Sequence, residues 1–304
     1  MMRTKTLLLS AIALLANLSA SAQTSTGTLG KVAETGAITI GYREAGIPLS
    51  YTDDRQQPIG YAVDLCRKVA EAVQKKLNMK SLEVRYAKVS GSTRIPLIVN
   101  GTVDLECGTT TNNLERQKQV AFSVTTFVAA NRFATRKSDN ITTLADLKGK
   151  TVTSNAGSDN LLQVNELNES QHLGMTVLPA KDFSEGFLML ETGRASALIL
   201  DDILLAGAIA NSKNPQEYVI SSEALSSEPY AIVMRRDDPA FKKVVDDALK
   251  DFYASGGAEQ LYKKWFQAPI PPRNITLNLP PSKALQRVWH SPTDSADPAT
   301  YVMK

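Results

Sequence analysis

Residue types that carry out catalysis are scarce in this sequence. It contains two histidines, His172 and His290, which lie far apart. The patterns HExxH, CxxC and GxSxG and the phosphate-binding loop are all absent. Because a lone histidine needs partners to do chemistry, both are expected to be solvated surface residues. The sequence therefore predicts no catalytic residue, no metal site and no cofactor.

A dominant charge of one sign is also missing. The chain has 34 basic and 31 acidic residues, and loss of Arg3 and Lys5 with a cleaved leader brings the net charge to about +1. Nucleic-acid binding requires a dense basic field, so this balance argues against nucleic acid as a partner. After the leader, no apolar run approaches the ~20 residues of a membrane span. The mature protein is therefore expected not to be embedded in a membrane.

The first residues predict an export signal. Arg3 and Lys5 give a positive start, an apolar run follows, and Ala20-Ser21-Ala22 supplies the small residues that a signal peptidase accepts. We expect a signal peptide over residues 1–22 and a mature chain that begins near Gln23. The alternative is a disordered or amphipathic N-terminus. No cysteine stands directly after the expected cleavage site, so a lipid anchor is not supported. The periplasm is the expected compartment.

Cysteine is almost absent as well, with Cys66 and Cys107 as its two occurrences. In an oxidising compartment an even pair suggests one disulfide. The alternative is two separate buried thiols, because free cysteine behaves as a small hydrophobic residue. The apolar spacing from Ala62 to Val73 places Cys66 on the core side of the first long helix.

The mature chain alternates between short β-rich runs and helical patterns, which is typical of an α/β architecture. Strands are expected over residues 37–42, 82–89, 103–107, 151–154, 175–178, 197–200 and 230–234. Helices are expected after Gly60 and over residues 94–100, 112–119, 159–168, 184–192, 202–211, 239–254 and 258–266. Two such cycles suggest two lobes, with the last elements returning to the first lobe. The proline-rich tail after Pro269 is expected to wrap the surface.

A loop rich in glycine and threonine, residues 108–113, follows one predicted strand and precedes a helix. Such a loop directs backbone N–H groups and hydroxyls at one point, and the helix N-terminus favours an anion there. Arg116 lies one turn further on and is able to form a bidentate pair with a carboxylate. The alternative is a capped turn with Arg116 on a solvated face.

Two further junctions have polar residues where a strand gives way to a helix. Ser158 and Asp159 open one helix, and both residue types also favour simple capping positions. Asp201 and Asp202 follow a buried strand, at the edge where α/β folds place ligand groups. One carboxylate there is suited to hold an ammonium group while the other caps the helix. The alternative is that both are surface or capping acids.

The segment Cys107-Gly108-Thr109-Thr110-Thr111-Asn112-Asn113-Leu114-Glu115-Arg116-Gln117-Lys118 resembles the characteristic segment of periplasmic glutamate/aspartate-binding proteins. Further matches to this family of amino-acid solute-binding proteins, family 3, follow in the same order: Arg43-Glu44, Pro48, Tyr51, Arg94-Ile95-Pro96-Leu97, Asp146-Leu147-Lys148-Gly149-Lys150, Leu190-Glu191-Thr192-Gly193-Arg194, Asp201-Asp202, Trp265-Phe266 and Pro269-Ile270-Pro271-Pro272. The resemblance implies a type II periplasmic-binding-protein fold, in which two α/β lobes joined by a two-strand hinge close on the ligand. The implied first lobe comprises residues 23–127 and 222–304, and the second lobe comprises residues 128–221.

The resemblance also implies roles for the two charged ends of a free amino acid. The arginine that matches Arg116 holds the α-carboxylate, helped by the loop position of Thr111. The aspartate that matches Asp201 receives the α-ammonium group, with the position of Thr109 assisting. A guanidinium and an acid from opposite lobes would then grip the groups that all free amino acids share.

Arginines that match Arg43 and Arg94 meet the side-chain carboxylate of the ligand in this family. Two guanidiniums select an acidic side chain, because a buried charge beside a neutral group is costly. Three positions depart from the family: a serine is Gly91 here, a histidine is Phe183 and a threonine is Asp159. Glutamate or aspartate remains the expected ligand, and a related polar amino acid such as an amide stays open.

The expected function is capture of an amino acid and its delivery to the membrane permease of an ABC importer, by a protein that is itself a monomer. Two alternatives share the fold. One is a periplasmic enzyme similar to cyclohexadienyl dehydratase, with Asp159 or Glu44 as general acid or base. The other is a ligand-sensing partner of a membrane receptor.

Overall fold

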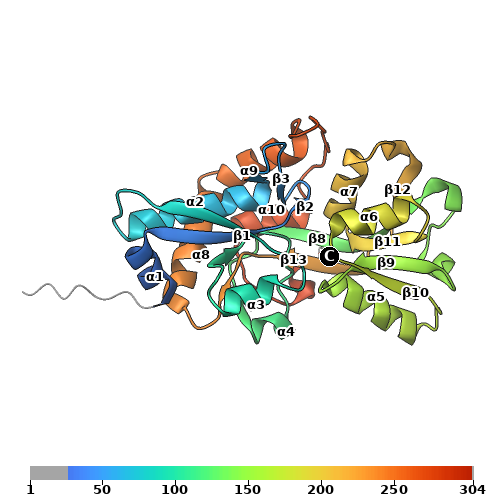
Figure 1. The fold of residues 1–304 in the computed structure, drawn as a ribbon, viewed down its shortest axis with the longest axis horizontal. Coiled ribbons are helices and arrows are strands. Elements are labelled where there is room, and N and C mark those ends of the chain that lie inside the picture. Colours follow the sequence, from blue (N-terminus) through green and yellow to red (C-terminus); the bar gives the residue numbers. More distant parts are fainter. Residues whose placement is uncertain (1–26, 303–304) are drawn as a thin grey trace, which may run out of the picture.

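The computed structural model describes residues 27–302. The predicted signal peptide over residues 1–22 and the expected start at Gln23 lie outside the described residues. The chain forms two α/β halves that lie side by side along the long axis of the molecule (Figure 1). The α/β class predicted from the alternating pattern is therefore confirmed.

The first half is built on a five-stranded sheet with the order β5-β1-β6-β14-β7. Its strands are β1 (Ala37–Tyr42), β5 (Glu83–Lys88), β6 (Leu105–Glu106), β7 (Val120–Phe122) and β14 (Val233–Arg235). The helices of this half are α1 (Gly27–Thr35), α2 (Tyr61–Lys76), α3 (Arg94–Val99), α4 (Leu114–Gln117) and α8 (Pro239–Ala254). Strand β14 comes from late in the chain and pairs antiparallel with β6 and β7. The predicted return of the chain to the first half is thus present.

The second half contains a sheet with the order β10-β9-β11-β8-β12, and β13 also pairs with β8. The strands are β8 (Phe127–Arg136), β9 (Thr151–Asn155), β10 (Thr176–Ala180), β11 (Ala197–Asp201), β12 (Tyr218–Ile220) and β13 (Ser226–Tyr230). The helical elements are η1 (Lys137–Asp139), η2 (Leu144–Leu147), α5 (Asp159–Ser170), α6 (Phe183–Glu191), α7 (Asp202–Asn211) and η3 (Pro215–Glu217). Strand β11 is buried along its whole length, as expected for an apolar strand covered on both faces.

Two chain segments cross between the halves, one from β7 to β8 and the other from β13 to β14. They run together, because Ser123 N donates to Ile232 O at 2.9 Å and Thr126 N donates to Tyr230 O at 2.8 Å. This is the two-strand hinge that the type II fold requires. The strand predicted over residues 230–234 is wrong in detail: it is divided between β13 and β14, because one part pairs in each sheet. The lobe boundaries at residues 128 and 222 stay predictions.

Some elements carry no sequence pattern strong enough to predict them. Helix α1 and the small sheet of β2 (Ala45–Gly46), β3 (Ser50–Thr52) and β4 (Pro58–Ile59) are examples. The small sheet matters for the site, since Ser50 Oγ accepts a 2.9 Å hydrogen bond from the backbone N–H of Arg43. The small sheet therefore fixes the backbone of Arg43.

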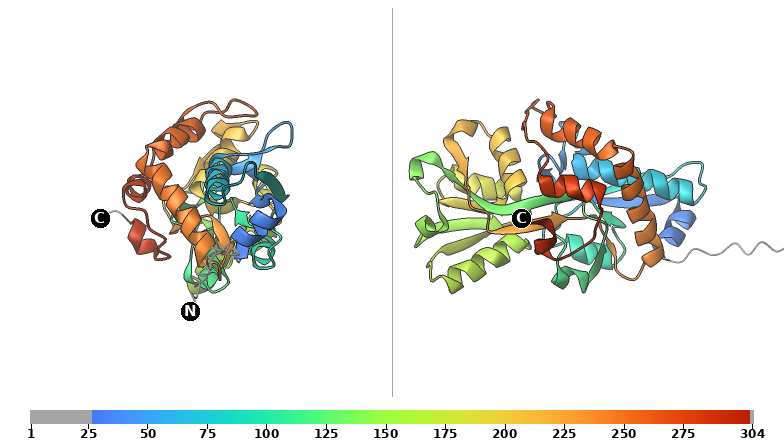
Figure 2. Two further views of the ribbon diagram at one scale, coloured as in Figure 1. Left: turned by 90° about the vertical axis from the view of Figure 1, so that its left-hand side faces the viewer. Right: turned by 180° about the vertical axis from the view of Figure 1, so that it is seen from behind.

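The C-terminal part comprises α9 (Gly257–Tyr262), a π-helical turn η4 (Lys263–Gln267), α10 (Lys283–His290) and η5 (Pro298–Tyr301). The tail after Pro269 also contains a helix, α10, that the sequence pattern did not predict. Helix α10 buries Leu285 and Trp289, and Tyr301 exchanges a 2.7 Å hydroxyl hydrogen bond with Thr125 at the crossing. From behind, this segment (red) lies over the junction of the halves (Figure 2).

Cys66 and Cys107 form a disulfide with their Cα atoms 6.2 Å apart, within the usual range. The alternative of two separate thiols is wrong. The bond joins the buried face of α2 to the residue that follows β6, directly before the threonine-rich loop. Because it closes a loop across 41 positions, it is expected to stabilise the fold by about 3–4 kcal/mol. It also fixes where the loop starts.

Candidate functional site

A narrow cleft between the two halves, here called the polar cleft, brings together the residues that the sequence singles out. All eight predicted ligand-binding residues line it: Arg43, Arg94, Thr109, Thr111, Arg116, Ser158, Asp159 and Asp201. The other lining residues are Gly91, Asn155, Asn160, Phe183, Leu200 and Leu204. The set combines residues from both halves, so the cleft depends on how the two halves come together. Contact of each residue with a ligand stays a prediction.

The threonine-rich loop holds Arg116 in a defined orientation. Asn113 caps α4, and its Oδ1 accepts a 2.8 Å hydrogen bond from Arg116 N. The guanidinium turns back and donates to the backbone oxygen of Thr111 at 3.0 Å. The Arg116 side chain is 9% exposed. The alternative of Arg116 on a solvated face is therefore wrong, because the loop folds over it.

The Arg116 guanidinium already meets a carboxylate from the opposite half. Its Nη1 lies 2.6 Å from Oδ2 of Asp159, the first residue of α5. Asn113 Nδ2 donates to the same oxygen at 2.9 Å. Ser158 is the N-cap of α5 and accepts from Leu161 N at 3.1 Å. The simple capping interpretation thus holds for Ser158, whereas Asp159 points into the polar cleft.

Arg43 and Arg94 are buried in the polar cleft without a carboxylate partner. Among residues 27–302 no carboxylate oxygen lies within ion-pair distance of either guanidinium. The hydrogen bonds of Arg94 to Thr109 O and Gly157 O are long, 3.5 and 3.3 Å, and its Nε has no partner in the part described. Buried polar atoms are rarely left in this state. The pair is therefore suited to receive an anion.

Burial sets the electrostatics of these two guanidiniums. Removal from water lowers the pKa of Arg94 to about 9, and the neighbouring Arg116 and Arg43 charges add to that effect. Burial likewise lowers the pKa of Arg43, which Glu106 partly offsets. With a pKa of about 9, Arg94 remains cationic at neutral pH. Arg43 also lies over the ring of Phe183, 4.2 Å from its centroid, so Phe183 supplies a π face to this guanidinium.

Asp201 ends β11 and is almost fully buried. Its Oδ1 accepts from Asn160 Nδ2 at 2.8 Å, and its Oδ2 accepts from the Tyr230 hydroxyl. Burial, reinforced by the charge of Glu228, raises the pKa of Asp201 to about 8. Asp201 makes no side-chain cap on α7, whereas Asp202 accepts from Ile203 N at 2.7 Å. The alternative that both acids are mere caps is therefore wrong.

Two residues that the sequence analysis did not identify act on Asp201: Tyr230 donates a hydrogen bond to it, and the charge of Glu228 raises its pKa. Tyr230 and Glu228 lie on β13 and are buried. Gln163 Nε2 donates to Glu228 Oε1 at 2.8 Å. No local signal marks these residues as partners of Asp201, because a strand far along the chain brings them there. Glu106, which offsets the charge of Arg43, was missed for the same reason.

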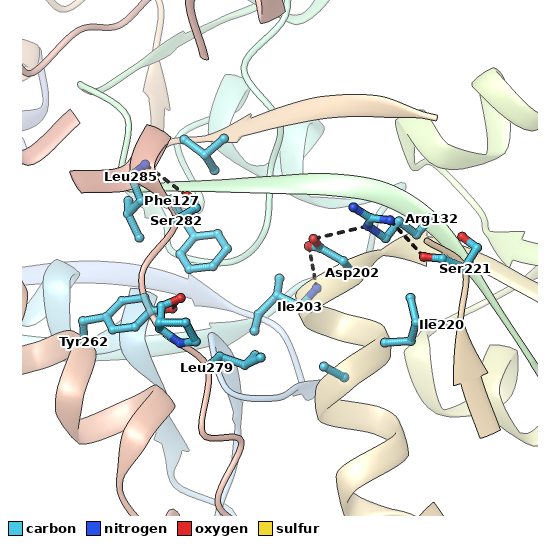
Figure 3. Close-up of a pocket in the computed structure, with 13 residues that line it drawn as sticks. Phe127, Arg132, Asp202, Ile203, Ile220, Ser221, Tyr262, Leu279, Ser282 and Leu285 are labelled. Atoms are coloured by element: carbon cyan, nitrogen blue, oxygen red, sulfur yellow. Dashed lines mark hydrogen bonds and ion pairs between the residues drawn. The ribbon is translucent and has the colours of Figure 1, made fainter. Parts of the chain in front are cut away.

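The polar cleft is small. Its volume is about 10 Å³, which is roughly the room that one water molecule needs. A second cavity between the halves, here called the apolar groove, is larger at about 260 Å³ (Figure 3). Phe127 and Ile203 are among the side chains that line it. None of the eight predicted ligand-binding residues lines the apolar groove.

Other classes of site find no support within residues 27–302. No group of His, Cys, Asp and Glu there is arranged to hold a metal ion. None of the helices in that range has the length and apolarity needed to cross a bilayer. His172 and His290 are exposed, as predicted.

Comparison with known proteins places these observations in context. The profile of the bacterial extracellular solute-binding proteins, family 3, matches residues 38–268. The chain is 50% identical to the L-glutamate/L-aspartate-binding protein of Pseudomonas aeruginosa, over 89% of this chain and 90% of that protein. It is 44% identical to the glutamate/aspartate import solute-binding protein of Escherichia coli, over 88% and 89% of the two chains.

A likeness to solved structures supports the same fold. A crystal structure of a mutant of ArgBP from T. maritima aligns with a TM-score of 0.69 at 28% identity. The alignment covers 79% of this chain and 99% of that one. The implied type II fold with two α/β lobes is thereby confirmed.

Proposed function

We propose, because the chain belongs to family 3 of the bacterial extracellular solute-binding proteins, that it captures L-glutamate or L-aspartate in the polar cleft and delivers it to an ABC importer. The two relatives described above are named for these ligands, and one is named for import. The proposed compartment is the periplasm, after removal of residues 1–22. The proposed partner is a membrane permease, and the protein acts as a monomer.

One observation carries the acidic preference: two buried guanidiniums, Arg43 and Arg94, lie in the cleft without a carboxylate partner among the described residues. Leaving such charges beside a neutral side chain would cost several kcal/mol. A second carboxylate on the ligand removes that cost, and a neutral amide does not. Glutamate and aspartate therefore fit better than glutamine and asparagine.

The shared ends of the ligand have their own proposed partners. Arg116 and Thr111 hold the α-carboxylate, and Asp201 with Thr109 holds the α-ammonium group. Ser158, the N-cap of α5, also lines the cleft and is proposed to contact the ligand. Closure excludes water and strengthens each ion pair, so the ligand stabilises the closed arrangement.

An enzyme on this fold has less support. Glu44 pairs with Lys88 and does not line the polar cleft, while Asp159 is held by Arg116. Both relatives are named as binding proteins rather than as enzymes. The chain is a binding protein without catalysis.

A panel of free amino acids on refolded, ligand-stripped protein tests the proposal. A ligand that binds only the native state raises the melting temperature as its concentration exceeds its Kd. We expect shifts with L-glutamate and L-aspartate and smaller ones with L-glutamine and L-asparagine. Arg85→Ala is a matched control, because Arg85 is exposed and pairs with Glu83. Absence of any shift with the two acidic amino acids would overturn the proposal.

A further inference from the structure

A buried carboxylate lies next to the polar cleft without lining it. Glu106 ends β6 in the first half and is 1% exposed, and it is not one of the residues that line the cleft. Its Oε2 accepts a 2.7 Å hydrogen bond from the hydroxyl of Thr110, while its Oε1 has no hydrogen-bond partner within residues 27–302. Burial of such an acid is costly unless a positive charge lies close to it.

Gly108 allows Glu106 to approach the Arg43 side chain. A Cβ atom at residue 108 would lie 2.2 Å from Glu106 Oε1 and 2.8 Å from Arg43 Cγ. Both side chains therefore reach the space that the missing Cβ leaves beside the threonine-rich loop. Arg94 is bonded to the same loop, because its Nη1 donates to Thr109 O at 3.5 Å. All of these residues belong to the first half, so their arrangement does not depend on how far the cleft is open.

The charge of Glu106 acts on both guanidiniums of the side-chain pocket. Burial lowers the pKa values of Arg43 and Arg94, and the negative charge of Glu106 counters that effect at each of them. In the described part of the chain, Glu106 forms no ion pair with either arginine. The N–H groups of both guanidiniums therefore stay available to a ligand, while part of their charge is already offset.

We infer that Glu106 is a specificity-determining residue: its buried carboxylate offsets part of the charge of Arg43 and Arg94, so that the cleft holds an acidic side chain less tightly than two guanidiniums alone would. The inference rests on the proposed function for the identity of the ligand. A negative charge at this place repels the side-chain carboxylate of glutamate and has little effect on a neutral amide. Because selectivity is a difference of affinities, Glu106 narrows the preference for glutamate over glutamine. It thereby moderates the affinity of a protein that has to release its ligand to an importer.

The test compares Glu106→Gln with the wild type by titration calorimetry of the ligand-stripped proteins with L-glutamate and with L-glutamine. The substitution keeps the shape of the side chain and an acceptor for the Thr110 hydroxyl, and it removes the charge. We expect L-glutamate to bind about tenfold more tightly to the variant, and the Kd of L-glutamine to change by less than about twofold. Glu106→Asp keeps the charge and should retain most of the wild-type ratio of the two Kd values. Glu71→Gln is the matched control, because Glu71 forms an exposed pair with Lys68 on α2, outside the cleft.

The outcomes separate this inference from the proposed function. A merely structural role of Glu106 would weaken both ligands by the same factor, so an unchanged or reduced ratio in Glu106→Gln overturns the inference. Equal effects of Glu106→Gln and Glu106→Asp also overturn it, since shape rather than charge would then be responsible. If the wild type binds neither ligand, the proposed function fails and the inference fails with it, whereas wild-type binding with an unchanged ratio in the variant overturns the inference alone. Glu106→Met removes the charge at a similar side-chain length and repeats the test should Glu106→Gln fold poorly.

Discussion

Two of the cavities between the halves, the polar cleft and the apolar groove, differ in size and in chemistry. The polar cleft holds three arginines in a volume of about 10 Å³. The apolar groove offers about 260 Å³, bordered by side chains such as Phe127 and Leu285 (Figure 3). Two consecutive aspartates face different cavities: Asp201 lines the cleft, and Asp202 lines the groove.

The difference lies in how completely the polar groups are paired. In the groove, Arg132 Nη1 donates to Ser221 O at 2.9 Å, and Arg132 Nε lies 3.8 Å from a carboxylate oxygen of Asp202. In the cleft, Arg94 Nε has no partner in the part of the chain described. A buried polar atom without a partner is costly, and a ligand that supplies one gains that energy. Unpaired buried charge, rather than volume, therefore supports the cleft as the binding site.

The largest expected effect comes from Arg116→Ala. Loss of one partner of a buried, hydrogen-bonded charge pair costs about 3–5 kcal/mol, so binding of L-glutamate should weaken at least ~100-fold. Titration calorimetry on ligand-stripped protein measures the change. A loss below about tenfold would mean that the α-carboxylate does not bind Arg116. The polar cleft would then have no stronger claim than the apolar groove to be the binding site.

Asp201 should make ligand binding and stability depend on pH. The pKa of Asp201 in the folded protein is about 8, above the usual value of 3.8. Between about pH 4 and pH 8, Asp201 is therefore protonated in the folded protein and ionised in the unfolded chain. The free energy of unfolding should therefore fall as pH rises from about 4 to 8, and Asp201→Asn should remove that fall. Urea unfolding at pH 5 and pH 8 measures both slopes.

The same residue predicts a proton released on binding at pH 7, because the ligand ammonium group favours the ionised carboxylate. Calorimetry in two buffers with different ionisation enthalpies counts that proton. Equal heats in both buffers would show that Asp201 does not change its charge when the ligand binds. Asp201→Asn should also weaken binding by about 100-fold, because it removes the only charge assigned to the ammonium group.

Arg43→Ala should alter selectivity more than affinity for the shared ends of the ligand. Removal of one guanidinium from the side-chain pocket should reduce the preference for L-glutamate over L-glutamine by about tenfold. Thermal shifts with both ligands, converted to Kd, provide the ratio. An unchanged ratio would assign the acidic preference to Arg94 or to another residue.

The smallest effect is expected in the groove. Arg132→Ala should change the Kd for L-glutamate by less than about twofold, because the residue does not line the cleft and sites without shared partners act independently. This is the same substitution as in the Arg116 experiment. A large loss of binding would show that the two cavities are coupled through β8, on which Arg132 lies.

Much of the candidate site was predictable from local sequence. Segments that pass from strand to polar loop to helix marked two candidate places, one with Thr109, Thr111 and Arg116 and the other with Ser158 and Asp159. Their assignment to opposite lobes came from the family resemblance. All of them line the polar cleft. The helices over residues 202–211 and 239–254 were predicted with the bounds of α7 and α8. Such features depend on neighbours within a few positions, which the sequence displays directly.

Other features depend on which distant segments meet. Tyr230 reaches Asp201 because β13 pairs with β8, and Asp159 reaches Arg116 because the halves close so far that glycines 91 and 157 touch. The sequence by itself determined the α/β class, the position of the threonine-rich loop between a strand and a helix, and the types of charge available to a ligand. Only the tertiary structure decided which charges are paired and which are left buried without a partner. The physical reason is that pairing depends on the distance between atoms brought together by folding, and no spacing along the chain records that distance.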